Sequence, residues 1–353
     1  MTRETKSGGS EHIDFDRTDD SDLVSVVIPA YNAETFIGKT LLSVIGQSYR
    51  NLEIIVVDDG SDDGTVSIVE ELARRDHRIR LITQENAGVG PARNRAIANS
   101  QGRLIAPVDA DDLWHPDKLA LQVEALRTAP PTVTVAYCWW VPIDEHDIVK
   151  SNGRIPFYCE LEGDVFSELA VQNFIGNGSV PLIRRSALHE VGGYDTDRVL
   201  QACADWKLYL QLAERGEFAL VKQVLVGYRQ FSRSMSTAPG PMERSWNATI
   251  QWVRERHPRL SPGTIRRQNF HEYAYLFVLA LKRRAFRSAL RYMIMAAANG
   301  PGRFSCMALD LLGTKVRPLI EGRSGESVPF LQTMARAPCS ARDLHNFEGL
   351  VQR

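Results

Sequence analysis

The chain lacks the cysteine patterns of disulfide-rich and zinc-binding proteins. Its 353 residues include five cysteines, an odd number, which are widely spaced and form no C-x-x-C pair. Disulfide frameworks and zinc sites need paired or clustered cysteines, so we expect reduced thiols in a cytosolic protein.

Long apolar runs and a strong net charge are also missing. No run reaches the roughly 20 apolar residues that a membrane-spanning helix needs, and the N-terminus has no apolar stretch of signal-peptide type. The formal net charge is −1 at pH 7, so no bulk attraction to nucleic acid is expected. We therefore expect a cytoplasmic protein that does not bind nucleic acid.

Glycine is absent where a dinucleotide-binding protein needs it. The first apolar run, residues 23–28, is followed by Pro29-Ala30-Tyr31-Asn32, with no glycine before Gly38. A Rossmann site requires glycine there so that the backbone can approach the pyrophosphate, and a Walker A loop is absent too. A Rossmann dinucleotide site therefore fits this sequence poorly.

Short apolar runs alternate with helical patterns along the first 140 residues. This alternation predicts βαβ units, and hence an α/β fold with a mostly parallel sheet flanked by helices. We expect strands over residues 23–28, 52–57, 78–82, 104–108 and 133–139, and helices over residues 34–47, 65–75, 91–100 and 116–128.

The two ends of the chain differ from the region between them. Residues 1–22 carry seven acidic and three basic side chains among Ser, Gly and Thr, which predicts a disordered tail. A domain over residues 23–236 is expected, then a helical region over 237–320 and a poorly ordered tail over 321–353.

The predicted C-terminal helices are basic. We expect helices over residues 270–281 and 285–298, and Arg283, Arg287 and Arg291 recur every fourth residue, which places them on one face. One interpretation is contact with an anionic membrane surface. The other is a helical cover whose arginines lie in water.

An acidic cluster, Asp109-Ala110-Asp111-Asp112, directly follows the apolar run 104–108. Open α/β sheets bind ligands beyond the carboxyl ends of their strands. Mg²⁺ and Mn²⁺ are usually held by one or two carboxylates together with the phosphates of a substrate. The cluster therefore suits a metal-bound diphosphate, and an acidic turn that caps the next helix is the alternative.

Other polar segments follow the neighbouring predicted strands and suit a nucleotide. Tyr31 offers a ring for a base, and either Asp58 or Asp59 offers a carboxylate for its polar edge. Arg93, in the glycine-containing segment 86–94, could contact the diphosphate beside the cation. The alternatives are a tight turn over 58–64 and a surface ion pair for Arg93.

Four segments together resemble the family 2 inverting glycosyltransferases of GT-A fold, because they occur in that family's order and spacing over residues 23–236. The segments are Val26–Asn32, Val56–Thr65, Asn86–Asn94 and Val108–Asp112. The resemblance implies a metal-dependent enzyme that moves a sugar from a nucleoside-diphosphate sugar, most commonly a UDP-sugar, to an acceptor hydroxyl. It also implies a role in cell-surface polysaccharide or glycolipid biosynthesis, with a saccharide or lipid-linked acceptor.

The resemblance assigns roles to individual residues. Asp111 would be the direct ligand of Mg²⁺ or Mn²⁺. Asp205, in Ala204-Asp205-Trp206, matches the E-D-W helix of the family, in which the Asp is the general base. The residues expected to hold the nucleotide and its diphosphate are Pro29, Tyr31, Asn32, Asp58, Asp59, Arg93 and Asp109.

Acceptor-side assignments have plainer alternatives. Asn177 and Gly178 are candidates for shaping the acceptor pocket or form an ordinary loop, and Trp206 lies against a sugar or in the core. Asp205 could also be a simple N-cap. Two positions depart from the family pattern, since Ala204 stands where Glu is usual and Phe231 where His is frequent.

Two rival functions remain. A nucleotidyltransferase also combines a nucleotide-binding sheet with paired Asp residues and a cation. That class usually carries a Gly-rich loop with Lys or Arg after the first strand, and this chain has none there. The second rival is a catalytically degenerate protein that binds a sugar nucleotide as a scaffold, which the departures at Ala204 and Phe231 would fit.

Overall fold

The computed structural model describes residues 22–150, 159–230, 239–305 and 330. The two predicted tails, apart from Asp22 and Phe330, lie outside the described residues, and so does Phe231.

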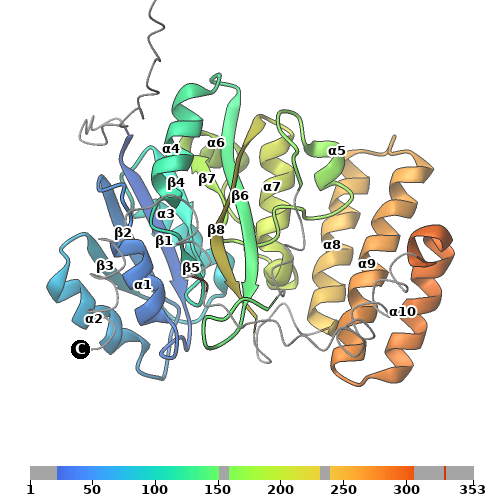
Figure 1. Ribbon diagram of the computed structural model, residues 1–353, viewed down its shortest axis with the longest axis horizontal. Coiled ribbons are helices and arrows are strands. Elements are labelled where there is room, and N and C mark those ends of the chain that lie inside the picture. The colour runs from blue at the N-terminus through green and yellow to red at the C-terminus, as the bar shows by residue number, and fades with distance from the viewer. Residues whose placement is uncertain (1–21, 151–158, 231–238, 306–329, 331–353) are drawn as a thin grey trace, which may run out of the picture.

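A single mixed sheet organises the described part of the chain (Figure 1). Its strands lie in the order β3-β2-β1-β4-β7-β6-β8-β5. Pairing is parallel between β1 and both its neighbours, between β2 and β3, and between β6 and β8, and antiparallel elsewhere. The strands are β1 (Val24–Ala30), β2 (Leu52–Asp58), β3 (Ile79–Thr83), β4 (Leu104–Pro107), β5 (Leu113–Trp114), β6 (Val133–Ile143), β7 (Leu182–Arg184) and β8 (Glu217–Arg229).

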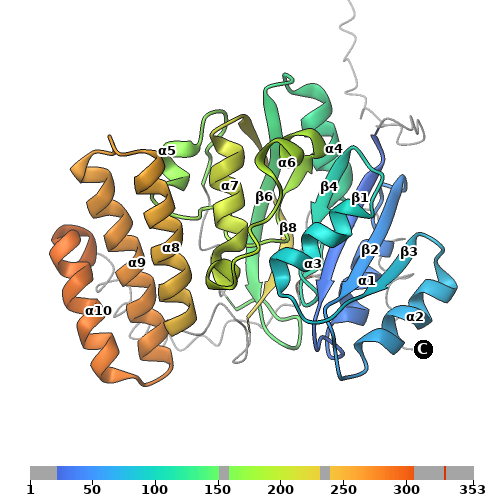
Figure 2. The same ribbon diagram turned by 180° about the vertical axis from the view of Figure 1, so that it is seen from behind.

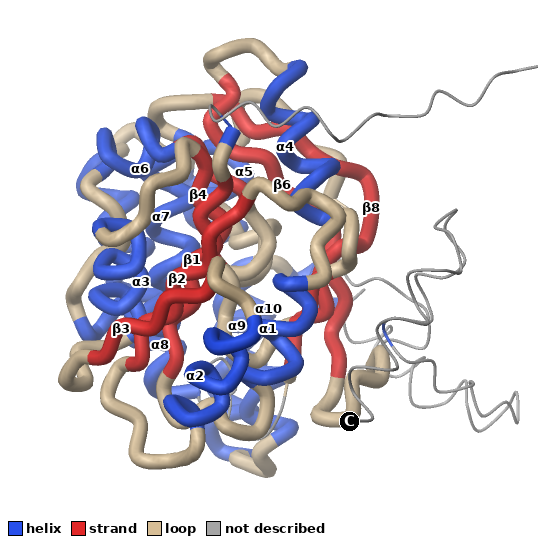
Figure 3. Tube along the Cα trace, turned by 90° about the vertical axis from the view of Figure 1, so that its left-hand side faces the viewer, coloured by secondary structure: helices blue, strands red, loops and turns tan. Residues whose placement is uncertain are grey.

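Helices cover both faces of this sheet. One face carries α1 (Ile37–Ile45), α2 (Thr65–Arg75) and α4 (Lys118–Thr128), and the other carries α3 (Val89–Ala98), α6 (Arg185–Val191) and α7 (Ala204–Ala213) (Figures 2 and 3). Because both faces are covered, the residues of β1 from Val24 to Ala30 are all buried. The predicted α/β class, with a mostly parallel sheet between helices, is confirmed.

Three further helices extend the molecule away from the β3 edge. They are α8 (Pro239–Arg256), α9 (Pro262–Lys282) and α10 (Phe286–Asn299), and α10 is the outermost (Figure 1). Helix α8 packs on the 3-10 helix η2 (Arg198–Cys203), α9 packs on α8, and α10 packs on α9. The short helix α5 (Phe166–Leu169) lies against α7. No helix within the described ranges is long and apolar enough to cross a membrane.

Pro107 explains how β4 ends. The N–H of Val108 donates to the carbonyl of Val27 in β1 at 3.1 Å, so the neighbouring Pro107 nitrogen points to the other side, towards β7. Pairing between β4 and β7 reaches only Ile105, and the missing N–H of Pro107 therefore costs no sheet hydrogen bond. Pairing with β7 has therefore ended before Pro107, and the chain turns into the acidic cluster after it.

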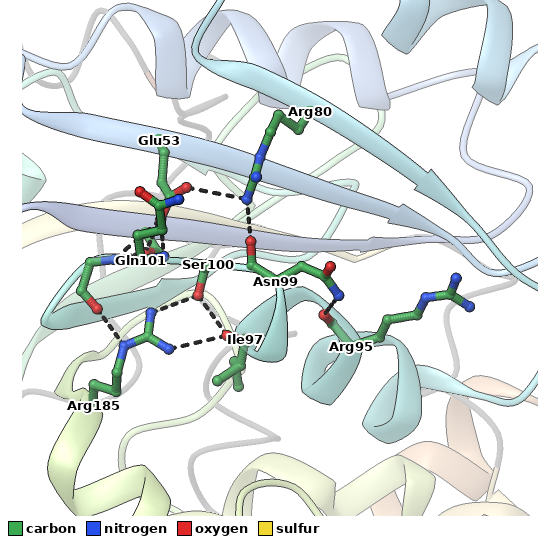
Figure 4. A network of polar contacts seen from close by, with 10 residues as sticks. Glu53, Arg80, Arg95, Ile97, Asn99, Ser100, Gln101 and Arg185 are labelled. Carbon is green, nitrogen blue, oxygen red and sulfur yellow. Dashed lines mark hydrogen bonds and ion pairs between the residues drawn. The ribbon is translucent and has the colours of Figure 1, made fainter.

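A polar network fixes the loop that leads into β4 (Figure 4). Oε1 of Glu53 in β2 accepts hydrogen bonds from the Ser25 hydroxyl at 2.7 Å and from the Gly102 N–H at 3.2 Å. Arg185 donates to the Ser100 hydroxyl at 2.7 Å and to the Ile97 carbonyl at 3.1 Å. This network joins the end of α3 to the amino ends of β1 and β2. It therefore fixes the position of the loop from which β4 begins.

We predict that Glu53→Ala lowers the free energy of unfolding by about 1–3 kcal/mol, because the hydroxyl of buried Ser25 loses its acceptor. Urea unfolding followed by circular dichroism measures this change. Glu70→Ala, on the exposed face of α2, is the matched control and should stay close to the wild type. Equal stability of the two variants would contradict a structural role for the network.

Candidate active site

The predicted polar segments meet at one edge of the sheet. Strands β2, β1 and β4 are adjacent and parallel, with Ala30 opposite Asp58 and Val27 opposite Pro107. Their carboxyl ends therefore lie side by side, and the residues that follow them share one edge. Pro29 is a buried residue of β1, whereas the Tyr31 that follows it is 55% exposed.

Asp58 has an unused acceptor in a buried place. The residue is 3% exposed, and its Oδ2 accepts a hydrogen bond from the Ser61 N–H at 3.2 Å. Its Oδ1 has no hydrogen-bond partner among the described residues. Buried polar atoms are almost always paired, so this oxygen suits an N–H donor of a ligand.

Asp59, the next residue, is also 3% exposed but has no spare oxygen. Oδ1 accepts from the Ala87 N–H at 2.9 Å and from Gln84 Nε2 at 2.6 Å, while Oδ2 accepts from the Gly88 N–H at 2.8 Å. The carboxylate therefore holds the loop that opens α3. Of the two adjacent aspartates, Asp58 is the one with a free acceptor.

Asn32 joins the first two segments. Its φ is +48°, in the left-handed region that Asn tolerates better than most residues. Its Oδ1 accepts from the Asp62 N–H at 3.0 Å, and its own N–H donates to the Ser61 hydroxyl at 2.9 Å. The tight turn expected over residues 58–64 is thus present and is tied to the end of β1.

Arg93 forms an ion pair with Asp109, and only Arg93 is buried, since the side chain of Asp109 is 28% exposed. Arg93, on α3, is 4% exposed, and its guanidinium carbon lies 4.9 Å from the centre of the Tyr194 ring. Burial is the largest single influence and acts to lower the pKa of Arg93, but Asp109, Tyr194, Asp205 and Tyr209 together outweigh it and the pKa is raised. The alternative of a surface ion pair is therefore wrong.

Gly178 allows this pair to form. A Cβ added there would lie 2.4 Å from Arg93 Nη2 and 3.2 Å from Asp109 Oδ2. The preceding Asn177 is 3% exposed, and its carbonyl accepts from the Tyr209 hydroxyl at 2.8 Å. Asn177 Nδ2 has no partner among the described residues. The segment is therefore built into the site and is not an ordinary loop.

The acidic cluster divides into different roles. Asp112 is fully buried and accepts hydrogen bonds from the Ser179 hydroxyl and, at 2.8 Å, from the Arg229 N–H. Asp111 has a pKa raised to about 7, chiefly by burial and then by the charge of Asp109, and Arg229 opposes this rise. With Asp112 held inward and Asp109 paired to Arg93, Asp111 is the carboxylate left for a ligand.

Arg229, to which the sequence analysis gave no role, supports this cluster. It ends β8, is 1% exposed, and donates through Nε to the Asp111 carbonyl at 2.6 Å. It also forms an ion pair with Asp147 at 2.6 Å. The signal in the sequence was an arginine at the end of an apolar run, but β8 itself was not predicted.

The residues present fit a divalent cation that arrives with its substrate. Within the described ranges, no three His, Cys, Asp or Glu side chains gather into a ready-made metal centre. Asp109 lies close enough to Asp111 to raise its pKa, and a cation would relieve that repulsion. Mg²⁺ and Mn²⁺ typically take one or two carboxylates and complete their shell with water and substrate phosphates.

Asp205 lies close enough to Arg93 and Asp109 for their charges to act on its pKa. It lies in the first turn of α7, and burial raises its pKa to about 6 while the positive charge of Arg93 opposes the rise. The N-cap of α7 is Cys203, without a side-chain cap bond. The N-cap alternative for Asp205 is therefore wrong.

Trp206 does not line the site. It is 1% exposed, its Nε1 donates to the Leu169 carbonyl at 2.8 Å, and its ring centre lies 4.7 Å from that of Trp246. This corrects the expectation of a sugar contact, because the ring is enclosed in the core. Ala204 is likewise buried, at 2% exposure.

Asn94 holds the two halves of the site together, and the sequence analysis had missed this role. Its Nδ2 donates to the Tyr194 carbonyl at 2.7 Å, and its Oδ1 accepts from the Tyr194 N–H at 2.8 Å. A Cβ at Gly193 would lie 2.7 Å from Asn94 Oδ1, and the φ of Gly193 is +77°. Helix α3, which carries Arg93, is thus hydrogen-bonded through Asn94 to the turn that leads towards α7 and Asp205.

Comparison with known sequences gives a consistent result. The model of "Glycosyl transferase family 2" matches residues 25–192. An uncharacterized glycosyltransferase of Haemophilus influenzae is 30% identical over 222 residues, which cover 61% of this chain and 68% of the relative.

Two other relatives match more strongly over shorter segments. Glycosyltransferase GlyA of Streptococcus pneumoniae serotype 4 is 46% identical over 152 residues, 43% of this chain and 20% of the relative. The putative teichuronic acid biosynthesis glycosyltransferase TuaG of Bacillus subtilis is 46% identical over 103 residues, 29% of this chain and 41% of the relative. The matches thus span well under two thirds of these two relatives.

Solved structures share the fold. TarS 1-349 of S. aureus, in complex with UDP-GlcNAc, has a TM-score of 0.53 at 14% identity and covers 78% of this chain and 91% of that chain. The mannosyltransferase PcManGT of Pyrobaculum calidifontis, in complex with GDP-Man and Mn²⁺, has a TM-score of 0.52 at 23% identity and covers 84% of this chain and 80% of that chain. The chain has the GT-A type of α/β fold and belongs to glycosyl transferase family 2.

Proposed function

We propose that the protein transfers a sugar from a nucleoside-diphosphate sugar to an acceptor hydroxyl, with a divalent cation and with inversion at the anomeric carbon. The observation that carries this proposal is the ion pair between buried Arg93 and Asp109, whose charge acts on both Asp111 and Asp205. This arrangement offers a positive group and a cation ligand for a diphosphate, and a base near them. Membership of the family and the fold of nucleotide-sugar complexes support it.

The donor base is assigned to the edge formed by β1 and β2. The free Oδ1 of Asp58 accepts one N–H from the base, and the exposed Tyr31 ring covers its face. Uracil presents one N–H on its pairing edge, which suits one free carboxylate oxygen, so we assign a UDP-sugar as the donor. Pro29, Asn32 and Asp59 shape this pocket through the β1 end, the 58–64 turn and the loop before α3.

The diphosphate is assigned to the edge formed by β4 and α3. Asp111, with Asp109 beside it, would hold Mg²⁺ or Mn²⁺ together with the phosphate oxygens. Such a cation offsets the negative charge that grows on the departing diphosphate. Arg93 contributes a fixed positive charge, and Asp109 holds its guanidinium in place.

Asp205 acts as the general base. Its pKa of about 6 leaves it mostly ionised at pH 7, yet more basic than an ordinary Asp. It lies near the Arg93–Asp109 pair, and we assign it to remove the proton of an acceptor hydroxyl that attacks the face opposite the leaving diphosphate. Asn177 and Gly178, beside the pair, shape the acceptor pocket.

The biological setting is proposed from the relatives. TuaG is named for teichuronic acid biosynthesis, so we assign this chain to cell-surface polysaccharide or glycolipid biosynthesis. The acceptor is then a saccharide or a lipid-linked saccharide, and the enzyme works at the inner face of the cell membrane.

A catalytically inactive scaffold is the second candidate. Ala204 favours it, because this position is buried and supplies no carboxylate where the family usually has Glu. A nucleotidyltransferase has less support, since no loop with Gly and Lys or Arg follows β1.

A panel of sugar nucleotides tests the function. We expect release of nucleoside diphosphate from a UDP-sugar in the presence of Mn²⁺, and loss of that release when EDTA removes the metal. Coupled-enzyme detection of the released diphosphate measures both. Tight donor binding without turnover, even with acceptors from a cell lysate, would support the scaffold, whereas release of pyrophosphate from a nucleoside triphosphate and a sugar phosphate would indicate a nucleotidyltransferase.

Asp205→Asn should lower kcat by about 10²–10⁴, because the positioned base is lost, while donor affinity stays within a few-fold. In the wild type, kcat/KM should fall as pH drops through about 6, where Asp205 becomes protonated. The variant should lack that limb of the profile. Asp197→Asn, at the exposed N-cap of η2, is the matched control, and near-normal turnover of Asp205→Asn would rule out its role.

Gly178→Ala should lower kcat/KM by about 10²-fold, as expected for small displacements of reacting groups. Buried Arg93 cannot swing away from the added methyl group, so the Arg93–Asp109 pair must shift. Steady-state kinetics measure the loss, and thermal unfolding checks that the fold is kept. Gly302→Ala, where a Cβ meets nothing within 4 Å, is the control. Wild-type kinetics in Gly178→Ala would contradict the proposed geometry.

A further inference from the structure

Helix α10 carries an exposed apolar stripe. Phe286, Leu290 and Ile294 are 69%, 55% and 59% exposed, and their spacing of four residues aligns them along one side of the helix. The opposite side, with Ala289, Tyr292 and Ala296, is buried. These three are among only seven large hydrophobic side chains that are well exposed in the described part of the chain.

The segment that contains the stripe has several basic residues and no acidic ones. Residues 273–305 contain no Asp or Glu, and Arg287 and Arg291 follow Phe286 and Leu290 directly, which places them along one flank of the stripe. Arg291 remains 63% exposed although it contacts Glu243 at 3.3 Å. The basic residues in this segment are Lys282, Arg283, Arg284, Arg287, Arg291 and Arg303.

The position of α10 leaves this face open to a large partner. It is the outermost helix, it packs on α9, and no described element lies over its outer side (Figures 1 and 2). Its 14 residues span about 21 Å at 1.5 Å per residue, and none of the described helices can cross a membrane. A flat contact along the helix is therefore the geometry to consider.

We propose that α10 lies in the plane of an anionic lipid surface, with Phe286, Leu290 and Ile294 inserted among the acyl chains and the neighbouring arginines at the lipid phosphates. An apolar stripe flanked by basic side chains is the pattern of interfacial helices. This proposal goes beyond the transferase activity and does not rest on it.

Charge argues against two other occupants. A second copy of this face would bring the same cluster of positive charges against itself. Residues 306–353 of this chain carry six basic and five acidic side chains, so they offer no negative counterpart. An anionic membrane supplies both the negative charge and the apolar medium.

Vesicle sedimentation with the full chain tests the proposal. We expect binding to phosphatidylcholine vesicles that contain about 30% phosphatidylglycerol, and at least about tenfold weaker binding to pure phosphatidylcholine. Raising the salt to about 0.5 M should weaken the binding, because the charges become screened. No sedimentation with anionic vesicles at low salt would overturn the proposal.

Two sets of variants separate insertion from charge. Replacing all three stripe residues by Ser keeps the charge and should lower the partition coefficient by about tenfold or more, whereas Val199→Ser, exposed on η2, should not. Arg287→Gln with Arg291→Gln should cost about fivefold for each arginine. The control is Arg74→Gln with Arg75→Gln on α2, the same change in charge at exposed sites elsewhere.

The remaining outcomes also decide the matter. Wild-type binding by the triple Ser variant would contradict insertion. A dimer in analytical ultracentrifugation that the triple Ser variant abolishes, with no vesicle binding, would assign the face to a second copy. Helix content by circular dichroism and diphosphate release without vesicles should be unchanged in every variant. An enzyme that binds vesicles but releases no diphosphate would contradict the proposed function and leave the membrane contact standing.

Discussion

The ion pair between Arg93 and Asp109 is the interaction on which the site depends. Arg93 is 4% exposed and Asp109 is 28% exposed, so removing Asp109 would leave a buried positive charge without its partner. The surrounding chain accommodates the pair. Gly178 leaves room for it, the Tyr194 ring lies against the guanidinium, and the charge of Arg93 acts to lower the pKa of Asp205. Segments that are distant in the sequence thus contact one another or interact electrostatically around this pair.

Much of the fold could be predicted because the parallel half of the sheet has a strong sequence pattern. Strands such as β1 are buried on both faces and read as continuous apolar runs, and α2 was found at its observed limits, Thr65–Arg75. Strands β5 and β7 have only two and three residues, too few for a pattern. Strand β8 was also missed, and β6 extends four residues beyond its predicted end at Trp139.

The sequence predicted which segments form the candidate site better than it predicted the role of each residue in it. Asp58 and Asp59 are identical in type and adjacent, so only the structure separates the free carboxylate from the one that holds the loop before α3. Trp206 fits either a core or a sugar contact until its burial is known. Arg229 and Asn94 act on backbone atoms far away in the chain, and no local motif reveals such contacts.

The different duties of Asp58 and Asp59 also bear on how such an enzyme could be altered. In the proposed site, Asp58 would face the base, while Asp59 holds the loop that opens α3, the helix that carries Arg93. Under this proposal, a change at Asp58 would alter the nucleobase preference without disturbing that loop. A change at Asp59 would remove the hydrogen bonds to Ala87 and Gly88 and so disturb the position of α3.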